Sequence, residues 1–219
     1  MNYEIEKKYV VKDFNKIIET LKKDFGNCEL RSKSGFWFAD NLFGDEAFLD
    51  VNNAKFSKKK VSSVKEIGEF EIPESDFQYL RLRIVNNEVF IVTLKIKNLT
   101  NNIEQNVEYE FETDEETFCR IAAYLKENAT VFYYNIKESY EFKKGDLKIE
   151  LSKFNNLKDV YLEVELVGEK EADLVKELES ELSKFESYDL KEEPRSYMEL
   201  AKSENRALFK NVKLTSYSK

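Results

Sequence analysis

Residues 2–11 read NYEIEKKYVV, and the organisation of the whole chain can be worked out from this stretch. Successive side chains of a β-strand point to opposite faces, so the alternation of charged and apolar residues here predicts a strand. One face of that strand would carry the charged side chains of Glu4, Glu6 and Lys8. The other face would carry the apolar side chains of Tyr3, Ile5 and Tyr9, with Lys7 as the one exception.

Alternation of this kind recurs along the chain, and we predict that each such stretch forms a strand. Asn86-Asn87 separates two of the stretches and is typical of a hairpin turn. Most of the strands place two or three ionisable side chains on one face, and both signs of charge occur. The predicted strands cover residues 2–11, 29–40, 78–86, 88–97, 104–113, 130–142, 147–152 and 158–167.

Apolar residues with a helical period predict helices, each with one face that must be covered. The first helix would begin after Asp13 as its N-cap and end at Gly26. A capping-box pattern at residues 113–116 would start the second helix, and Ser196 with Glu199 would start a short fourth one. The predicted helices cover residues 13–25, residues from 114 onward, residues 171–185 and a segment from Ser196.

Two arrangements of the charged strand faces are open. A single amphipathic strand normally turns its charged face to solvent. Several strands share the pattern, however, and the helices need apolar faces to cover, so the charged faces can instead meet across a closed sheet. Such a fold is an α+β closed antiparallel β-barrel with a polar interior and with helices packed outside, and we predict this arrangement.

The chain has 219 residues with only 6 glycines and 2 prolines, and no linker divides it. We therefore predict a single domain over residues 1–203. Within it, residues 41–77 are expected to form a long surface loop or insertion, with room for one short strand in residues 52–76. Residues 204–219 are expected to form a C-terminal tail.

Composition excludes several classes of function. The chain has no histidine, which removes imidazole acid–base chemistry and histidine-bound zinc. With two cysteines, no apolar stretch long enough to span a membrane and a charged N-terminus, we expect a cytoplasmic protein. The net charge of −8 makes a nucleic acid duplex or a membrane surface an unfavourable partner.

The charged faces nevertheless suit a definite chemistry. Carboxylates two residues apart on a strand present neighbouring oxygens, which suit Mg²⁺ or Mn²⁺. Lysine and arginine rows suit phosphate oxygens, and a metal ion between carboxylates and a polyphosphate would neutralise both. No P-loop pattern is present, so a Walker-type nucleotide site is excluded.

Residues 4–8 (Glu-Ile-Glu-Lys-Lys) resemble the ExExK signature of the CYTH superfamily, also called triphosphate tunnel metalloenzymes. That superfamily includes class IV adenylyl cyclases, thiamine triphosphatases and inorganic triphosphatases. The order in which further motifs follow is more specific than ExExK alone, and the resemblance spans about residues 3–200. These motifs are Arg81-Leu82-Arg83, Thr93-Leu94-Lys95, Glu108-Tyr109-Glu110, Glu163-Val164-Glu165 and the segment from Arg195 to Leu200.

The resemblance implies an eight-stranded antiparallel tunnel that holds a small-molecule triphosphate and one or two divalent metal ions, Mg²⁺ or Mn²⁺. By position, the metal ligands would be Glu4, Glu6, Glu163 and Glu165, with Glu108, Glu110 and Glu150 near the same ions. The substrate contacts would be Lys8, Arg81, Arg83, Lys95, Lys97 and Lys137. Among these cations, Lys8, Arg81 and Lys95 are the expected catalytic residues.

Three functions follow from this resemblance. The first is metal-dependent hydrolysis of a triphosphate at its terminal phosphoanhydride. The second is a class IV adenylyl cyclase, which would make cyclic AMP from ATP in the same tunnel. The third is a module that binds polyphosphate or a nucleotide without turnover, because Asn106 or Val107 stands where the family often has an arginine ahead of the central ExE motif.

Overall fold

The structure is a computed structural model, and the chain divides in it into two compact units. Unit 1 comprises Met1–Lys33, Lys97–Glu108 and Asn135–Ala207, and unit 2 comprises Ser34–Ile96, Tyr109–Tyr134 and Leu208–Lys219. The prediction of one domain over residues 1–203 therefore stays a prediction. The residues that the structure describes are 2–39, 47–50, 55–58, 65–67, 70–72, 79–128, 131–168 and 171–204.

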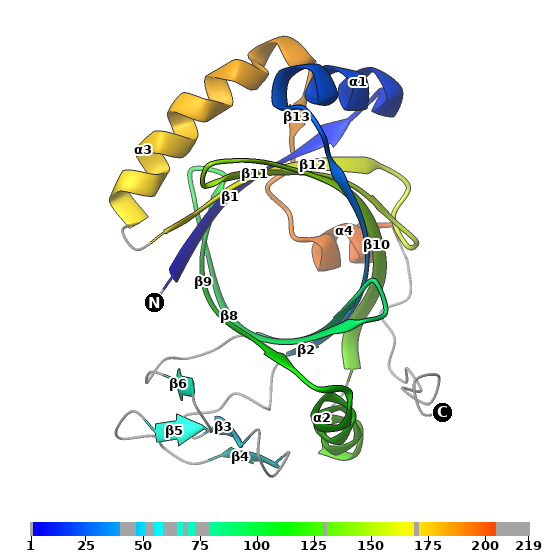
Figure 1. Ribbon diagram of the computed structural model, residues 1–219, viewed down its shortest axis with the longest axis vertical. Helices are drawn as coiled ribbons and strands as arrows, with labels where there is room; N and C mark the ends of the chain where they lie inside the picture. Colours follow the sequence, from blue (N-terminus) through cyan, green and yellow to red (C-terminus); the bar gives the residue numbers. More distant parts are fainter. Residues whose placement is uncertain are drawn as a thin grey trace. The chain divides into compact units, whose positions relative to one another are not determined.

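The secondary structure is mixed, and antiparallel strands form most of it, which confirms the α+β class (Figure 1). The helices are α1 (Phe14–Phe25), α2 (Glu115–Asn128), α3 (Glu171–Leu182), the 3₁₀ helix η1 (Ser183–Tyr188) and α4 (Tyr197–Ser203). The longer strands are β1 (Asn2–Val11), β2 (Glu29–Ala39), β7 (Tyr79–Val85), β8 (Val89–Thr100), β9 (Ile103–Thr113), β10 (Val131–Lys144), β11 (Leu147–Phe154) and β12 (Val160–Gly168). The shorter strands are β3 (Ala47–Asp50), β4 (Lys55–Lys58), β5 (Lys65–Ile67), β6 (Phe70–Ile72) and β13 (Lys191–Glu192).

The sheet of unit 1 places the first strand of the chain beside one of the last. β1 pairs with β12 along nine residues and, at its other edge, with β9 and β13. β12 pairs in turn with β11, and β11 with β10, and all of these pairs are antiparallel. Because β1 has neighbours on both edges, its backbone donors and acceptors are used within the sheet.

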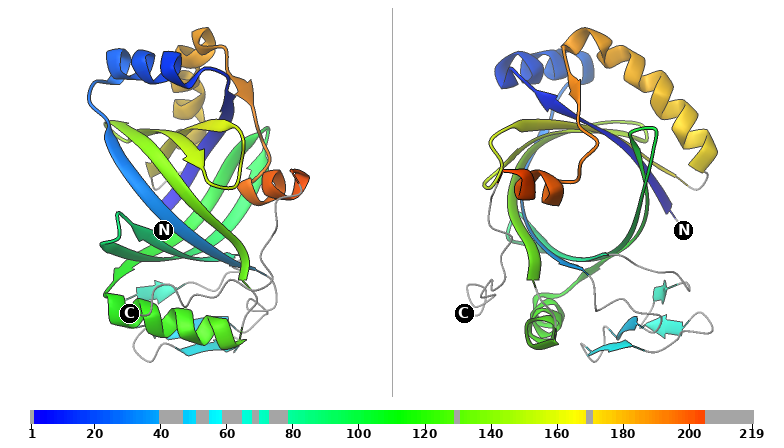
Figure 2. Two further views of the ribbon diagram at one scale, coloured as in Figure 1. Left: turned by 90° about the vertical axis from the view of Figure 1, so that its right-hand side faces the viewer. Right: turned by 180° about the vertical axis from the view of Figure 1, so that it is seen from behind.

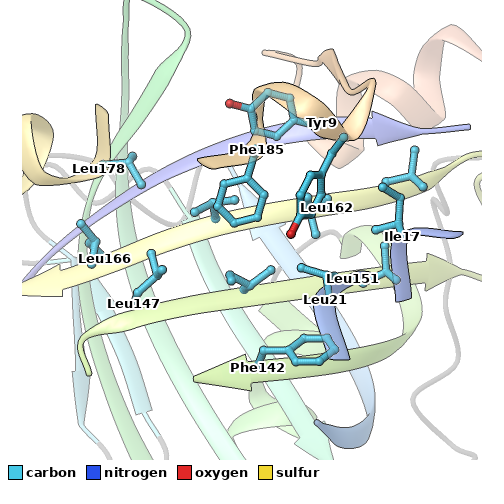
Figure 3. Close-up of a cluster of buried hydrophobic side chains, with 14 of the residues drawn as sticks. Tyr9, Ile17, Leu21, Phe142, Leu147, Leu151, Leu162, Leu166, Leu178 and Phe185 are labelled. Carbon is cyan, nitrogen blue, oxygen red and sulfur yellow. The ribbon is translucent and has the colours of Figure 1, made fainter. Parts of the chain in front are cut away.

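One face of this sheet packs against α1, α3 and η1 (Figures 1 and 3). Alternate residues of β1, β11 and β12 supply its apolar side chains, and Ile5 and Leu162 have no exposed surface. Ile17 and Leu21 of α1 and Leu178 of α3 cover them. The 3.6-residue period of the helices and the two-residue period of the strands meet in this core, as the sequence predicts.

The ends of α1 are those predicted. The carboxylate of Asp13 accepts a hydrogen bond of 3.0 Å from the backbone N–H of Lys16, which makes Asp13 the N-cap. Gly26 follows the helix with a φ of +85°, and its N–H donates to the carbonyl of Lys22 at 3.0 Å. A residue with a Cβ atom rarely adopts that φ, so glycine is suited to end the helix here.

The third helix differs from the prediction near its end. The helical period suggested residues 171–185, but the α-helix ends at Leu182 and the chain continues as the 3₁₀ helix η1 to Tyr188. The Ser183 hydroxyl donates to the carbonyl of Ser180 at 2.7 Å. Serine competes for backbone acceptors in this way, which weakens a continuing α-helix.

Unit 2 contains the β7–β8 hairpin, and α2 packs against it (Figure 2). The turn residues Asn86 and Asn87 have φ values of 52° and 61°, as a type I′ turn requires, which confirms the predicted hairpin. Phe90 of β8 and Phe118 of α2 have ring centroids 5.2 Å apart. Asp114 caps α2 by accepting from the N–H of Thr117 at 2.7 Å.

The region 41–77 was expected to be a long surface loop with room for one short strand, and its described parts contain more strands than that. β3 pairs with β4, and β5 pairs with β6, so two short hairpins form there. The weak alternation in this lysine- and serine-rich segment hid them. The other residues of 41–77, and the predicted tail 204–219 after Glu204, lie outside the described residues. Among the described helices, none is both long and apolar enough to cross a membrane.

Candidate functional site

The second face of the unit 1 sheet is charged, and it is buried. Lys8 and Glu150 are each only 4% exposed, although both belong to polar faces of their strands. This low exposure argues against the arrangement in which the charged strand faces are turned to solvent, because a solvent-facing surface would expose these side chains. Buried charges persist only when they are paired, hydrated or bound to an ion.

Strand register brings like charges directly opposite one another. Glu6 of β1 faces Glu104 of β9 on one side and Glu165 of β12 on the other. Glu163 of β12 likewise faces Glu150 of β11. Side chains in such positions have Cβ atoms about 5 Å apart, and like charges there are destabilising unless a cation lies between them.

Glu150 is the centre of the ion pairs. Its Oε1 atom lies 2.9 Å from the Nζ atoms of both Lys33 and Lys137, and its Oε2 atom lies 3.6 Å from Nζ of Lys148. Burial opposes ionisation of this carboxyl, but the three lysines together hold its pKa well below the usual range. Glu150 is therefore a carboxylate at neutral pH.

Each of the neighbouring carboxylates also has a lysine. Nζ of Lys137 lies 2.7 Å from Oε2 of Glu163, so this lysine bridges two carboxylates. Burial opposes ionisation of Glu163, and Lys137 is the main group that lowers its pKa. The remaining pairs are Lys148 with Glu165 at 2.9 Å, Lys8 with Glu104 at 3.6 Å, and Lys33 with Glu141.

We refer to ten of these side chains as the charged cluster. When all are ionised, six carboxylates and four ammonium groups give it a net charge of −2. Arg31, which approaches Glu141 at 3.5 Å, is shared with Glu29 and adds no net charge. The cluster consists of Glu6, Lys8, Lys33, Glu104, Lys137, Glu141, Lys148, Glu150, Glu163 and Glu165.

Helix α4 adds an aromatic side chain to the cluster. It lies on the side of the β10–β12 strands opposite to α1 and α3 (Figure 1). The predicted capping box is confirmed, because the Ser196 N–H donates to the Glu199 carboxylate at 2.7 Å and the Ser196 hydroxyl oxygen accepts from the Glu199 N–H at 3.3 Å. Burial, followed by the nearby Glu163 carboxylate, raises the pKa of the Tyr197 hydroxyl well above its ordinary value.

Unit 2 holds the predicted arginine pair. The guanidinium of Arg81 donates to the Thr93 hydroxyl and to Glu110, each at 3.1 Å. The Thr93 hydroxyl also donates to Glu110, at 3.0 Å. Arg81 is buried at 5% exposure, and Lys95 is buried two residues along β8 from Thr93. This group gathers a guanidinium and an ammonium on the polar face of one hairpin.

The predicted site residues are thus distributed over both units. Glu4 lies in unit 1, next to the cluster, and accepts from the amide of Asn106 at 3.3 Å. The side chain of Lys97 lies outside the described ones. Unit 1 contains Glu4, Glu6, Lys8, Lys97, Glu108, Lys137, Glu150, Glu163 and Glu165, and unit 2 contains Arg81, Arg83, Lys95 and Glu110.

Four members of the charged cluster, and Tyr197 beside it, were not among the predicted site residues. Lys33, Glu141 and Lys148 lie on strands that were predicted correctly, and alternation alone could have placed them on polar faces. Glu104 begins a predicted strand and shows no motif. Tyr197 lies in the motif segment from Arg195 to Leu200, and the structure shows that its ring contacts Lys8 of the cluster.

The donor set of the cluster fits a hard divalent cation. Its ligands are carboxylate oxygens, and these ten side chains include more carboxylates than ammonium groups, so a bound cation would offset negative charge. Among the described residues, no three acidic or thiol side chains lie in an arrangement that could by itself hold a metal ion. Lysine ammonium groups lie between the carboxylates instead, so binding a metal requires these side chains to shift.

Comparison with known proteins identifies the family. The sequence model of the CYTH domain matches residues 69–197, so this chain belongs to the CYTH domain family. The first strand, with Glu4 and Glu6, precedes the matched segment. No curated protein matches the chain.

Solved structures share the fold. A protein from Pyrococcus horikoshii has a TM-score of 0.61 at 20% identity and covers 90% of this chain and 98% of its own. A putative adenylate cyclase from Vibrio parahaemolyticus has a TM-score of 0.58 at 15% identity, covering 91% and 98%. A putative adenylyl cyclase from Hippeastrum, described as having a dominant triphosphatase activity, has a TM-score of 0.52 at 16% identity, covering 92% and 96%.

Proposed function

We propose that this chain is a divalent-metal-dependent triphosphatase, which hydrolyses the terminal phosphoanhydride of a small-molecule triphosphate. The observation that carries the proposal is the buried charged cluster. Its carboxylates would bind the metal ion of a metal–polyphosphate complex, and its lysines would bind the phosphate oxygens. Membership of the CYTH domain family supports it. The substrate class comprises inorganic tripolyphosphate and nucleoside or thiamine triphosphates.

The proposed enzyme encloses its substrate in a tunnel of eight antiparallel strands. The pairing of β1 with β12, which joins the first strand of the chain to a late one, supports closure of the sheet. Closure also explains why charged strand faces are shielded from solvent.

The metal ion, Mg²⁺ or Mn²⁺, would be held by Glu4, Glu6, Glu163 and Glu165, with Glu108, Glu110 and Glu150 nearby. When bound, it would neutralise phosphate charge and polarise the phosphorus that is attacked. The phosphate chain would be bound by Lys8, Arg81, Arg83, Lys95, Lys97 and Lys137. Arg81, Lys8 and Lys95 would stabilise the charge that develops on the phosphate oxygens during hydrolysis.

The adenylyl cyclase reading is the second candidate, because the Vibrio relative carries that name. A cyclase would use the same cations and carboxylates but would attack the phosphorus next to the ribose. The two reactions therefore differ in their products. Cyclic AMP and pyrophosphate indicate the cyclase, whereas ADP and orthophosphate indicate the hydrolase.

The test is a product assay with the full chain. Purified protein is incubated with tripolyphosphate, ATP or thiamine triphosphate and with Mg²⁺ or Mn²⁺, and products are identified by mass spectrometry. We expect orthophosphate release, which Glu163→Gln abolishes and Glu177→Gln, an exposed change on α3, leaves intact. Cyclic AMP as the main product, or no product from any substrate, would contradict the proposal.

A further inference from the structure

We propose that Tyr197 is a positioning residue that holds Lys8 and Lys137 ready for a phosphate ligand. The proposal rests on the proposed function, since it concerns how the same site binds its substrate. It assigns to the C-terminal helix α4 a part in substrate binding. The group involved is the aromatic ring of Tyr197 rather than its hydroxyl.

The ring of Tyr197 lies against both lysines. Nζ of Lys8 is 4.6 Å from the ring centroid, and Nζ of Lys137 is 5.7 Å from it. Both distances are within the range in which an aromatic face attracts an ammonium group. Lys8 comes from β1 and Lys137 from β10, so one ring connects cations from two strands that do not pair with each other in unit 1.

Neighbouring aromatic side chains fix the ring in place. The centroid of Phe154 lies 4.2 Å from that of Tyr197, and the centroid of Tyr161 lies 5.3 Å away at a steep angle. Phe154 also lies 5.6 Å from Nζ of Lys137. Rings that pack in this way have little freedom to turn, so the ring presents a fixed face to the two ammonium groups.

The segment that carries Tyr197 is attached to the backbone of Lys8. The N–H of Glu193 donates to the carbonyl of Lys8 at 2.9 Å. Arg195 then binds the carboxylate of Glu193 through two bonds, from Nε at 2.7 Å and from Nη2 at 2.6 Å. A bidentate pair of this kind holds its geometry well. The strand residue Lys8 and the ring above its side chain are thus part of one connected unit.

An aromatic ring has an advantage over a carboxylate at this position. A carboxylate would hold the lysines by neutralising them, and it would repel an incoming phosphate. The ring attracts an ammonium group through its quadrupole and carries no net charge. Lys8 already pairs with Glu104 at 3.6 Å, and Lys137 already pairs with Glu150 at 2.9 Å and Glu163 at 2.7 Å. The ring therefore holds both lysines further without adding negative charge that would repel a phosphate.

The test measures binding of inorganic tripolyphosphate by calorimetry in the presence of EDTA, where a metal-dependent reaction cannot proceed. We expect Tyr197→Leu to weaken binding about ten-fold, because both ammonium groups lose the ring. Tyr197→Phe should stay within about two-fold, because the ring remains. In turnover assays, KM should rise with Tyr197→Leu while kcat changes less, since the lysines bind the phosphate chain before and during reaction.

A matched control separates positioning from general destabilisation. Tyr188→Leu removes a tyrosine that is buried in the apolar core and is not part of the charged cluster. It also removes the hydrogen bond of 2.6 Å that the Tyr188 hydroxyl donates to Asp24. It should lower the melting temperature and leave tripolyphosphate affinity unchanged. Tyr197→Met replaces Tyr197→Leu if the latter does not fold.

Two results would overturn the proposal. One is unchanged affinity in folded Tyr197→Leu or Tyr197→Met protein. The other is an equal loss of affinity in Tyr197→Phe, which would assign the effect to the hydroxyl. Failure of the proposed function gives a different result, in which the wild-type chain binds tripolyphosphate without releasing phosphate. In that case the comparison of binding affinities between the variants still decides the role of Tyr197.

Discussion

The two faces of β1 are both buried, yet they are buried by opposite means. Ile5 and Tyr9 on one face are covered by α1, α3 and η1, and dispersion and the hydrophobic effect stabilise them. Glu6 and Lys8 on the other face are just as inaccessible, but they depend on ions of opposite sign. Low exposure therefore has two different meanings on this strand. The apolar face belongs to a core that stabilises the fold, whereas the charged face lowers stability unless its charges are paired with ions of opposite sign.

The largest expected effect comes from removing the central carboxylate of the charged face. Glu150→Gln leaves three lysine contacts without their anion, and we expect it to lower the free energy of unfolding by about 3 to 5 kcal/mol. Urea denaturation measures the change. Glu177→Gln on the exposed side of α3 is the control and should change stability little. An equally stable Glu150→Gln protein would mean that these ion pairs do not form.

A substitution on the apolar face of the same sheet should lower stability without affecting the charged cluster. Leu162→Ala, at a site with no exposed surface, should cost about 3 kcal/mol through lost contacts and a cavity. Because the cavity lies on the far side of the sheet, the folded variant should keep its affinity for tripolyphosphate. A loss of affinity at a temperature where the variant is folded would show that the two faces are not independent.

Divalent cations should stabilise only the charged face. With Mg²⁺ at about one hundred times its dissociation constant, we expect roughly 2.7 kcal/mol of added stability, because the ion balances the net charge of the cluster. Glu6→Gln should remove most of this gain, and Leu162→Ala should not. Differential scanning fluorimetry with and without Mg²⁺ distinguishes these cases. A rise in melting temperature that persists in Glu6→Gln would place the ion elsewhere.

Acid should weaken the charged face before the apolar one. Lysines hold the pKa values of Glu150 and Glu163 below those of the unfolded chain, so the unfolded state binds more protons as pH falls. The stabilisation is complete above the unfolded value of about 4.3 and is lost as pH drops through the lower folded values. Unfolding midpoints between neutral pH and pH 3 test this. The acid-induced loss should be smaller in Glu150→Gln than in the wild type, and an identical loss would contradict the assignment.

Much of the fold was predictable from local pattern. Alternation found the eight long strands within a few residues, and the caps at Asp13 and Ser196 were recognised from their sequence. It also assigned Glu6 and Glu163 to polar faces. The hairpins within 41–77 and the 3₁₀ end of the third helix were missed, because short strands and competing serine bonds leave little periodic signal.

The arrangement within the site was less predictable, because it depends on register between strands that are distant in sequence. Alternation says that Glu6 and Glu165 lie on polar faces, but only the pairing of β1 with β12 shows that they are directly opposite. Lys33 was missed for the same reason, since nothing near it in sequence indicates that it meets Glu150. Tyr197 carries no charge, so its contact with two lysines had no signal in a charge pattern.

The central claim is that the charged cluster holds a metal ion and a phosphate chain together. It is tested most directly by a crystal structure of the full chain grown with Mn²⁺ and tripolyphosphate, in which anomalous scattering locates the manganese. We predict manganese on carboxylates of β1 and β12, with phosphate oxygens at Lys8 and Lys137. Manganese only on exposed carboxylates, with tripolyphosphate absent from the cluster, would contradict the account.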